Sequence, residues 1–325
     1  MNNLTGNDQI MTVLGPISAD DLGVTLVHEH MVFGFPGWFA DETVAPYDRM
    51  AIEAKCLEVL KDIKSVGVQS IIDTTPCDMG GRDAALLKGL SEKSGINIIV
   101  VTGLYYEKDG GAPYYRWLRF ANRDIEEDIY ELFKTEITTG IGKTGVRPGL
   151  IKVATDDPII TEYEQLIIRA AVRVSKETGI PIMTHCQGDT VGPAQQDLFL
   201  QLGANPKKIV IGHQNNSADI NYHLFQLDRP GFFLGFDRTG AINGPQAEES
   251  LIELIRRGYA DRLMISHDFT AFWLGRPFDL GPKAAEWYPT YIHKKLIPKM
   301  KAAGVTDAQI HTILVKNPRR FFTGG

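Results

Sequence analysis

Short apolar stretches rich in β-branched residues recur along the chain, and segments of mixed polarity separate them. Almost every position within such a stretch is apolar, which is typical of strands buried on both faces of a parallel sheet. Eight stretches show this pattern: VTLVH (24–28), VQSIIDTT (68–75), INIIVVTG (96–103), GLIKVAT (149–155), IPIMTH (180–185), KIVIGH (208–213), FFLGFD (232–237) and RLMISHD (262–268).

The segments between these stretches repeat apolar residues every three or four positions, which indicates helices with one buried face. Several end in glycine, the residue favoured just after the last helical turn, namely 53–67, 164–179, 195–203 and 247–258. Residues 103–119, directly after the third strand, form the longest segment that we expect to be irregular. Because strands and helices alternate without a break in composition, we expect an α/β fold, a single (β/α)8 TIM barrel over residues 1–325.

Composition narrows the class of protein. The 325 residues hold 34 Lys+Arg against 40 Asp+Glu, and 43% are hydrophobic, close to globular averages. A net charge of −6 without a basic run argues against nucleic acid or an anionic membrane as a partner. No apolar stretch approaches the ~18–20 residues that cross a bilayer, and the start lacks a secretory pattern. Three scattered cysteines form neither a disulfide framework nor a CxxC motif, so we expect a cytoplasmic protein.

Candidate chemistry gathers where the predicted strands end. In HEH (28–30), alternation along a strand puts His28 and His30 on one face and Glu29 on the other. Each ligand-type residue alone has an ordinary explanation, such as a hydrogen-bonded histidine or a lysine whose ammonium reaches the strand end. Six of them at the mouth of one barrel instead favour an active site, because loops after the strands build that face. The other four are Lys152, His185, His213 and Asp268.

The chain resembles the phosphotriesterase-like branch of the amidohydrolase superfamily over nearly its whole length. The stretches that carry the resemblance follow one another in the expected order: LGVTLVHEH (22–30), GLIKVATD (149–156), PIMTH (181–185), IGHQNNSADINY (211–222), LGFDR (234–238), MISHD (264–268) and NPRRFF (317–322). The resemblance implies a binuclear metal-dependent hydrolase whose nucleophile is a hydroxide that bridges the two metals.

The same resemblance assigns the ligands. It implies that His28, His30 and Asp268 hold the more buried metal, and that Lys152, carboxylated on its amine, bridges the two ions. The ligands implied for the more exposed metal are His185 and His213. Imidazole and carboxylate donors suit zinc, which we expect first, and also cobalt, iron or manganese.

Elementary chemistry is consistent with these roles. Burial and neighbouring cations favour the neutral amine of Lys152, which is the form that adds carbon dioxide to give a carbamate. Two divalent ions lower the pKa of a shared water and polarise an ester carbonyl or phosphoryl oxygen. Asp268 is then the expected proton acceptor and donor. The alternative is that Asp268 only supports His267, although adjacent strand residues face opposite sides.

Two positions favour a lactonase within this family. Tyr105 matches a tyrosine that abuts the metal centre of lactonase-like members, and Arg238 matches an arginine typical of that branch. We expect Phe269 and Trp273 to add an apolar wall to the substrate pocket. The alternatives are a tyrosine that only packs and an arginine that only pairs with Asp237 or a loop carboxylate.

The predicted function is therefore a lactonase with promiscuous phosphotriesterase activity. One alternative is a phosphotriesterase (aryldialkylphosphatase), or a hydrolase of other carboxylic esters or phosphorylated lactones. Arg238 and Arg276 are the evident loop cations for a phosphorylated substrate. A catalytically silent barrel that only binds a ligand is the alternative from another class. The partner expected is a small-molecule ester, and the resemblance implies a homodimer.

Overall fold

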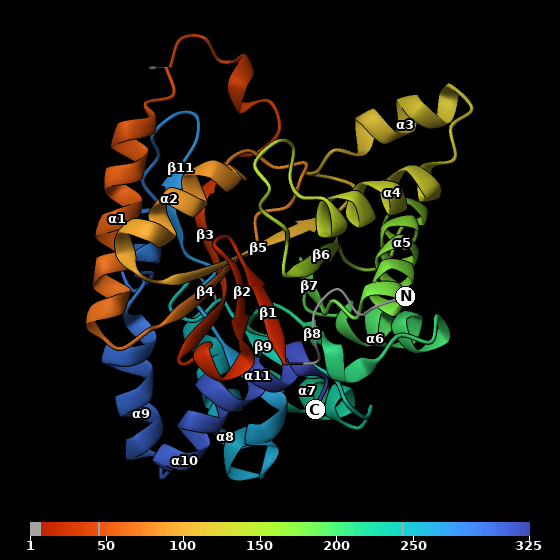
Figure 1. The fold of residues 1–325 in the computed structure, drawn as a ribbon. Coiled ribbons are helices and arrows are strands. Elements are labelled where there is room, and N and C mark those ends of the chain that lie inside the picture. The colour runs from red at the N-terminus through yellow and green to blue at the C-terminus, as the bar shows by residue number, and fades with distance from the viewer. Residues whose placement is uncertain (1–7, 45, 242–243) are drawn as a thin grey trace.

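A parallel sheet forms the centre of the molecule (Figure 1). The structure is a computed structural model that describes residues 8–44, 46–241 and 244–325, with the backbone alone for 244–246 and 283. Within these residues the strands lie in the order β10-β9-β8-β7-β6-β5-β4-β3-β11. Their bounds are β3 (Thr25–Phe33), β4 (Ser70–Asp73), β5 (Asn97–Gly103), β6 (Leu150–Thr155), β7 (Ile182–Cys186), β8 (Ile209–Ile211), β9 (Phe233–Phe236), β10 (Leu263–Ile265) and β11 (Thr270–Trp273).

The sheet closes on itself at the eighth strand position. β10 and β11 belong to one stretch of chain, in which β10 pairs with β9 and β11 pairs with β3. In the break between them, the Asp268 amide donates to the His28 carbonyl (3.0 Å) and the His30 amide donates to the Phe269 carbonyl (2.9 Å). The expected α/β barrel of the TIM type is therefore confirmed. The eighth strand, however, was expected to continue to residue 268 and ends at Ile265.

Helices cover the outer face of the barrel (Figure 1). The four expected ones are present and start a few residues earlier than predicted, as α1 (Arg49–Ser65), α5 (Glu162–Thr178), α6 (Gly192–Gln201) and α8 (Gly244–Arg256). The start of α5 is set by a capping box between Thr161 and Glu164, and its end by Gly179 in a left-handed conformation. The remaining helices are α2 (Ala84–Ser94), α4 (Ile125–Thr138), α7 (Ile220–Leu227), α9 (Ile297–Ala302), α10 (Asp307–His311) and α11 (Asn317–Thr323), with π-helical turns at Ile292–Leu296 and Thr312–Lys316.

The prediction of an irregular segment at 103–119 is wrong for its second half. That half forms α3 (Ala112–Phe120), which carries a proline in its first turn, where the missing N–H has no helical partner to lose. α3 buries only Ala112 and Tyr115 and projects from the barrel at the upper right of Figure 1. Gly110, Gly111 and Pro113 stand at its start, and such residues favour a loop when the sequence is read alone.

Apolar residues fill the barrel from its amino-terminal end. Inward side chains form one layer with the residues Val27, Ile72, Ile99, Val101, Leu150, Met183, Val210, Phe233 and Met264. The antiparallel hairpin of β1 (Gln9–Thr12) and β2 (Gly15–Ser18) adds Ile10 to this layer, and α11 adds Phe321. Nearer the carboxyl ends of the strands the buried residues include the polar His28, His30 and Lys152, so the candidate chemistry lies at this end. Within the described residues, none of the helices is both long and apolar enough to span a membrane.

Candidate active site

A cavity of about 330 Å³ opens at the carboxyl ends of the barrel strands. It is lined by five of the six ligand-type residues, namely His28, His30, Lys152, His185 and Asp268. The sixth, His213, is 1% exposed and lies beside His185, with its Nε2 2.7 Å from His185 Nδ1. The structure therefore brings all six predicted residues together.

Local departures from regular strand geometry aim these side chains into the barrel. β3 has a bulge between Leu26 and Glu29, where its register against β4 shifts, and a bulge re-aims the residues that follow it. His213 and Asp268 lie just after their strands with left-handed backbones, at φ 56° and 54°. Such a conformation costs a residue with a side chain about 1–3 kcal/mol, so it persists only where surrounding contacts hold it.

The first group of side chains surrounds the carboxylate of Asp268. Its Oδ1 lies 3.1 Å from His30 Nε2 and 3.4 Å from His28 Nε2. Ligand atoms of these three residues all lie within 4.8 Å of one another, a spacing that a metal ion could use. Lys152 is 1% exposed, and its Nζ is 2.9 Å from His28 Nε2. Arg238 Nε donates to Asp268 Oδ2 at 3.0 Å.

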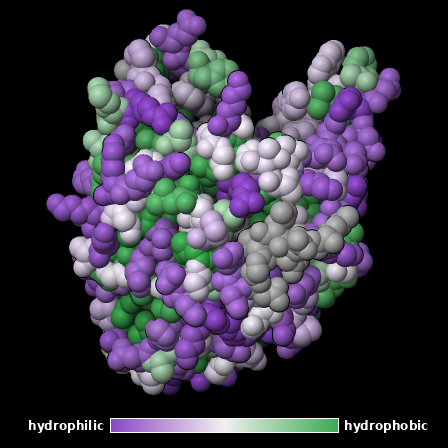
Figure 2. All heavy atoms as spheres, in the orientation of Figure 1, coloured by the Kyte–Doolittle hydropathy of each residue, from purple (hydrophilic) through white to green (hydrophobic). Residues whose placement is uncertain are grey.

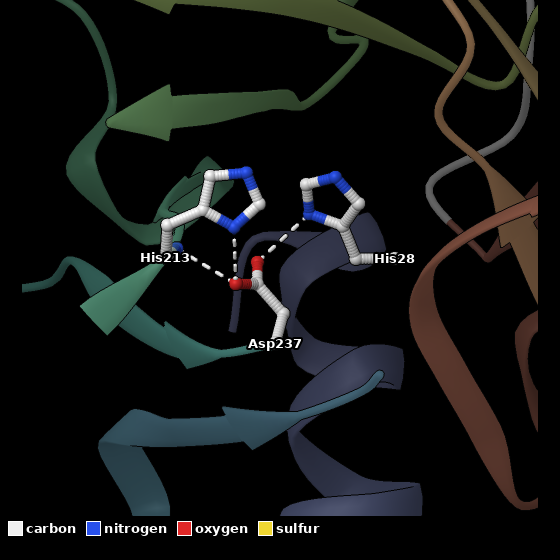
Figure 3. Close-up of side chains that lie close together, drawn as sticks. All are labelled: His28, His213 and Asp237. Atoms are coloured by element: carbon white, nitrogen blue, oxygen red, sulfur yellow. Dashed lines mark hydrogen bonds and ion pairs between the residues drawn. The ribbon is translucent and has the colours of Figure 1, made fainter. Parts of the chain in front are cut away.

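Asp237 joins this group to the second histidine pair, a role that the sequence analysis missed (Figure 3). Its Oδ2 accepts from His28 Nδ1 and its Oδ1 from His213 Nδ1, both at 2.8 Å. Because an ionised carboxylate can only accept, both histidines carry their proton on Nδ1 and present Nε2 as a lone pair. Asp237 closes the stretch 232–237, and its position between two ligand-bearing strands is the signal that could have found it.

Burial and charge set the protonation states. Burial lowers the pKa of His213 to about 3 and also lowers the pKa values of His28 and His185, so all three imidazoles are neutral near pH 7. Burial alone would raise the pKa of Asp268, but the neighbouring imidazoles and Arg238 outweigh it and hold that pKa well below its usual range. Neutral imidazoles beside an ionised carboxylate are the forms that bind divalent metals.

Lys152 is unusual because its amine loses its proton easily. Burial lowers the pKa of Lys152 to about 8, although Asp237 and Asp268 work in the opposite direction. A lysine with this pKa holds a reactive share of neutral amine at neutral pH. The amine is therefore suited to nucleophilic addition rather than to a permanent ion pair.

The predicted substrate residues are brought to the cavity with one exception. Tyr105, Arg238 and Trp273 line it. Phe269 does not belong to the lining described for this cavity, and its ring packs edge-on against Trp287 at 5.9 Å between centroids. The expectation that Phe269 forms part of a substrate wall therefore stays a prediction, with its ring packed against a residue of that wall. Trp287, which the sequence analysis missed, lines the cavity.

The contacts of Arg238 and Tyr105 bear on the alternatives that the arginine only pairs with Asp237 or a loop carboxylate and that the tyrosine only packs. Arg238 pairs with Asp268 rather than with Asp237, and its Nη1 donates to Asn216 Oδ1 at 3.1 Å. Tyr105 packs edge-on against the His185 ring at 4.9 Å between centroids, and burial raises the pKa of its hydroxyl. Both residues therefore touch the predicted ligands directly.

Comparisons with known proteins agree with this geometry. A model of the Phosphotriesterase family matches residues 8–322. The chain is 34% identical to an aryldialkylphosphatase of Saccharolobus solfataricus over 94% of its own length and 97% of that protein. It superposes on an organophosphorus hydrolase from Deinococcus radiodurans with a TM-score of 0.93, 41% identity and 97% of each chain covered. A further solved structure, from the engineering of organophosphate hydrolysis activity in a weak promiscuous lactonase template, gives a TM-score of 0.92 at 40% identity, with 97% of this chain and 99% of that chain covered. The chain is therefore a hydrolase that belongs to the phosphotriesterase family.

Proposed function

We propose that the protein is a binuclear metal-dependent hydrolase, a lactonase that also hydrolyses phosphotriesters, and that residues 1–325 form its single catalytic domain. The observation that carries this proposal is the gathering of four histidines, a carboxylate and a reactive lysine at one end of the barrel. A structural histidine cluster has no need of a buried lysine whose pKa is lowered, whereas a site for two cations can use one as a bridging ligand.

The donor set fits two divalent metals. His28, His30 and Asp268 would hold one of them, and the donors for the other would be His185 and His213. The nitrogen and carboxylate ligands suit zinc first, and cobalt, iron and manganese after it. When bound, the two ions would lower the pKa of a shared water and polarise the carbonyl or phosphoryl oxygen of the substrate.

Lys152 would supply the bridge as a carbamate. Its neutral amine attacks carbon dioxide and loses one proton, which gives an anionic group with two oxygen donors. We expect Lys152→Ala to lose bound metal, as measured by elemental analysis of the purified protein. Partial recovery of metal and activity with added short carboxylic acids would support the carbamate, because such acids can replace its two oxygens. Full metal content in Lys152→Ala would contradict the bridge.

Asp268 would move the proton. Its carboxylate faces the cavity and would accept a proton from the attacking water, then deliver it to the leaving oxygen. Arg238 holds Oδ2 of this carboxylate at 3.0 Å, which fixes its direction during both transfers. The Tyr105 hydroxyl, on the cavity wall, would donate a hydrogen bond to the oxygen that gains charge.

The cavity wall favours neutral, partly apolar esters. Six aromatic residues contribute to the wall, namely Phe33, Phe35, Tyr105, Tyr106, Trp273 and Trp287. Arg238 and Lys152 are the cations of the described lining, and Arg276 is instead exposed and paired with Asp41 at 2.7 Å. The cavity therefore offers few cationic side chains to bind the phosphate of a phosphorylated lactone. The lactonase template among the solved relatives supports lactones as the preferred substrates. The similarity to an aryldialkylphosphatase supports the phosphotriesterase alternative.

One preparation can separate these functions. Protein grown with zinc and bicarbonate would be assayed for metal content and for turnover of γ- and δ-lactones and aryl dialkyl phosphotriesters. We expect two metals per chain, with lactones turned over more efficiently than triesters. Faster hydrolysis of triesters would reverse the substrate order. Two bound metals without any turnover would favour the silent binding protein, and absence of paired metals would refute the hydrolase mechanism.

We also propose that the protein forms a homodimer, which would cover exposed apolar side chains on its surface. Figure 2 shows two projections at the top of the molecule with a hollow between them, and Figure 1 identifies them as α3 and the loop after β3. Both expose large apolar side chains, namely Tyr114, Trp117, Phe120, Phe35 and Phe39. Sedimentation analysis would give twice the mass of one chain, and a single-chain mass at micromolar concentration would refute the dimer. A cytoplasmic location stays a prediction from the sequence.

A further inference from the structure

Glu29 stands between two candidate metal ligands but faces away from them. Its side chain is 4% exposed, and in the described part of the chain no lysine or arginine lies within ion-pair distance of its carboxylate. A buried carboxylate without a cation is stable only if hydrogen bonds replace the water it has lost. Glu29 has four such bonds, and all four donors belong to the segment 266–269.

The four bonds bracket Asp268. Glu29 Oε1 accepts from Ser266 Oγ (2.7 Å), from the His267 amide (3.0 Å) and from His267 Nδ1 (2.8 Å). Its Oε2 accepts from the Phe269 amide at 3.0 Å. The amides on both sides of Asp268 are therefore bound to one carboxylate.

The bracketed residue has a backbone that needs such support. Asp268 has a φ of 54°, in the left-handed region that residues with a side chain rarely adopt. Its own amide donates to the His28 carbonyl at 3.0 Å. The three consecutive amides of residues 267–269 are thus held by β3, two of them through the Glu29 side chain. His267 reinforces the arrangement, because its Nε2 accepts the Ile292 amide at 3.2 Å.

We propose that Glu29 is a positioning residue that holds the Asp268 backbone in its left-handed conformation and thereby keeps the Asp268 carboxylate among His28, His30 and Arg238. This inference rests on the proposed function, because it concerns the residue that binds metal and moves the proton there. Glu29 acts only through Asp268 and touches no substrate.

Replacement of the carboxylate by an amide tests the role. In Glu29→Gln, the amide nitrogen must face an N–H donor of the segment 266–269, and one or more of the four bonds is lost. We expect cobalt(II) to bind 10- to 100-fold more weakly, the range found for partners behind metal ligands, with an altered visible absorption band. On the best substrate, kcat should fall at least tenfold and KM should change little, because the cavity wall is untouched.

A matched control separates positioning from stability. Glu248 is also buried (3% exposed), and its carboxylate accepts from the Tyr291 hydroxyl at 2.9 Å and pairs with Lys299 at 3.0 Å, away from the cavity lining. Glu248→Gln should lower the melting temperature as Glu29→Gln does, but should leave cobalt affinity and absorption unchanged. If Glu29→Gln fails to fold, Glu29→Asp replaces it, because the shorter acid keeps the charge but cannot reach the amides on both sides of Asp268.

The outcomes are distinct. Cobalt affinity and absorption like those of the wild type in Glu29→Gln, or in Glu29→Asp where the glutamine variant does not fold, would overturn the inference and leave the proposed function intact. Equal loss of cobalt affinity in Glu248→Gln would also overturn it, because the loss would then follow stability alone. A wild-type protein that binds no cobalt would overturn the proposed metal site and this inference together.

Discussion

At the scale of the single residue, the protonation of the Lys152 amine should depend strongly on pH near neutrality. Because burial lowers its pKa to about 8, the reactive neutral amine increases as the pH rises through 8, from about one tenth at pH 7 to about nine tenths at pH 9. The neighbouring His213 does not titrate in this range, since its pKa is about 3.

We therefore predict a pH-dependent recovery of metal-free protein. At constant dissolved carbon dioxide, the rate at which zinc restores activity should rise about tenfold per pH unit below pH 7.5 and level off above pH 8.5. Stopped assays of activity against time would measure it. A rate that keeps rising to pH 10 would show that Lys152 has an ordinary lysine pKa and contradict the prediction.

Asp268 gives a second prediction at the residue scale. Asp268→Ala should lower kcat by about 10²–10⁴-fold, the usual contribution of a positioned proton-transfer group, while circular dichroism shows a folded barrel. The exposed Asp197, which pairs with Arg229 at 2.7 Å, is the control, and Asp197→Ala should keep full activity. Activity within a few-fold of wild type in Asp268→Ala would show that another group moves the proton.

At the scale of the strand, the sequence predicted which face of the strand carries the candidate ligands, but it did not predict the backbone conformation that directs every side chain. Alternation correctly placed His28 and His30 together and Glu29 opposite, because the direction of side chains along a strand is a local property. It could not predict the left-handed backbones of His213 and Asp268, because contacts from other strands hold them.

The end of β5 supports a prediction about strand spacing. Gly103 has a φ of 141°, and a Cβ there would lie 1.9 Å from the Lys152 carbonyl oxygen. Gly103→Ala should push β5 away from β6, lower stability by about 1–3 kcal/mol through overpacking, and weaken zinc binding by displacing Lys152. Urea unfolding and metal analysis would measure the two effects.

Gly15 provides a control that separates the effect of steric crowding from the effect of backbone strain. Gly15 also has a positive φ, 112°, but no atom of the described residues lies within 4 Å of its Cβ position. Gly15→Ala should therefore lower stability through strain alone and keep full zinc binding. Normal zinc binding in Gly103→Ala would show that Lys152 tolerates the shift.

At the scale of the whole molecule, metal binding should stabilise the fold. The proposed ligands come from several strands around the barrel and meet only when it closes. A metal would therefore bind the folded chain and stabilise it by about 4 kcal/mol at a thousandfold excess over Kd. We predict that chelation lowers the melting temperature by roughly 5–15 °C for a chain of this size. Differential scanning calorimetry with and without a chelator would measure this, and an unchanged melting temperature would argue against tightly bound metal.

The sequence by itself determined the barrel and the types of residue at its mouth, because the burial pattern of strands and helices and the alternation of side chains are local. Only the tertiary structure decided how these residues meet. Asp237 bonds His28 across 209 positions of the chain, and Glu29 holds the segment around Asp268 across 237 or more. Such contacts form only when the first and last strands pair and close the barrel, so no pattern within one segment could predict them.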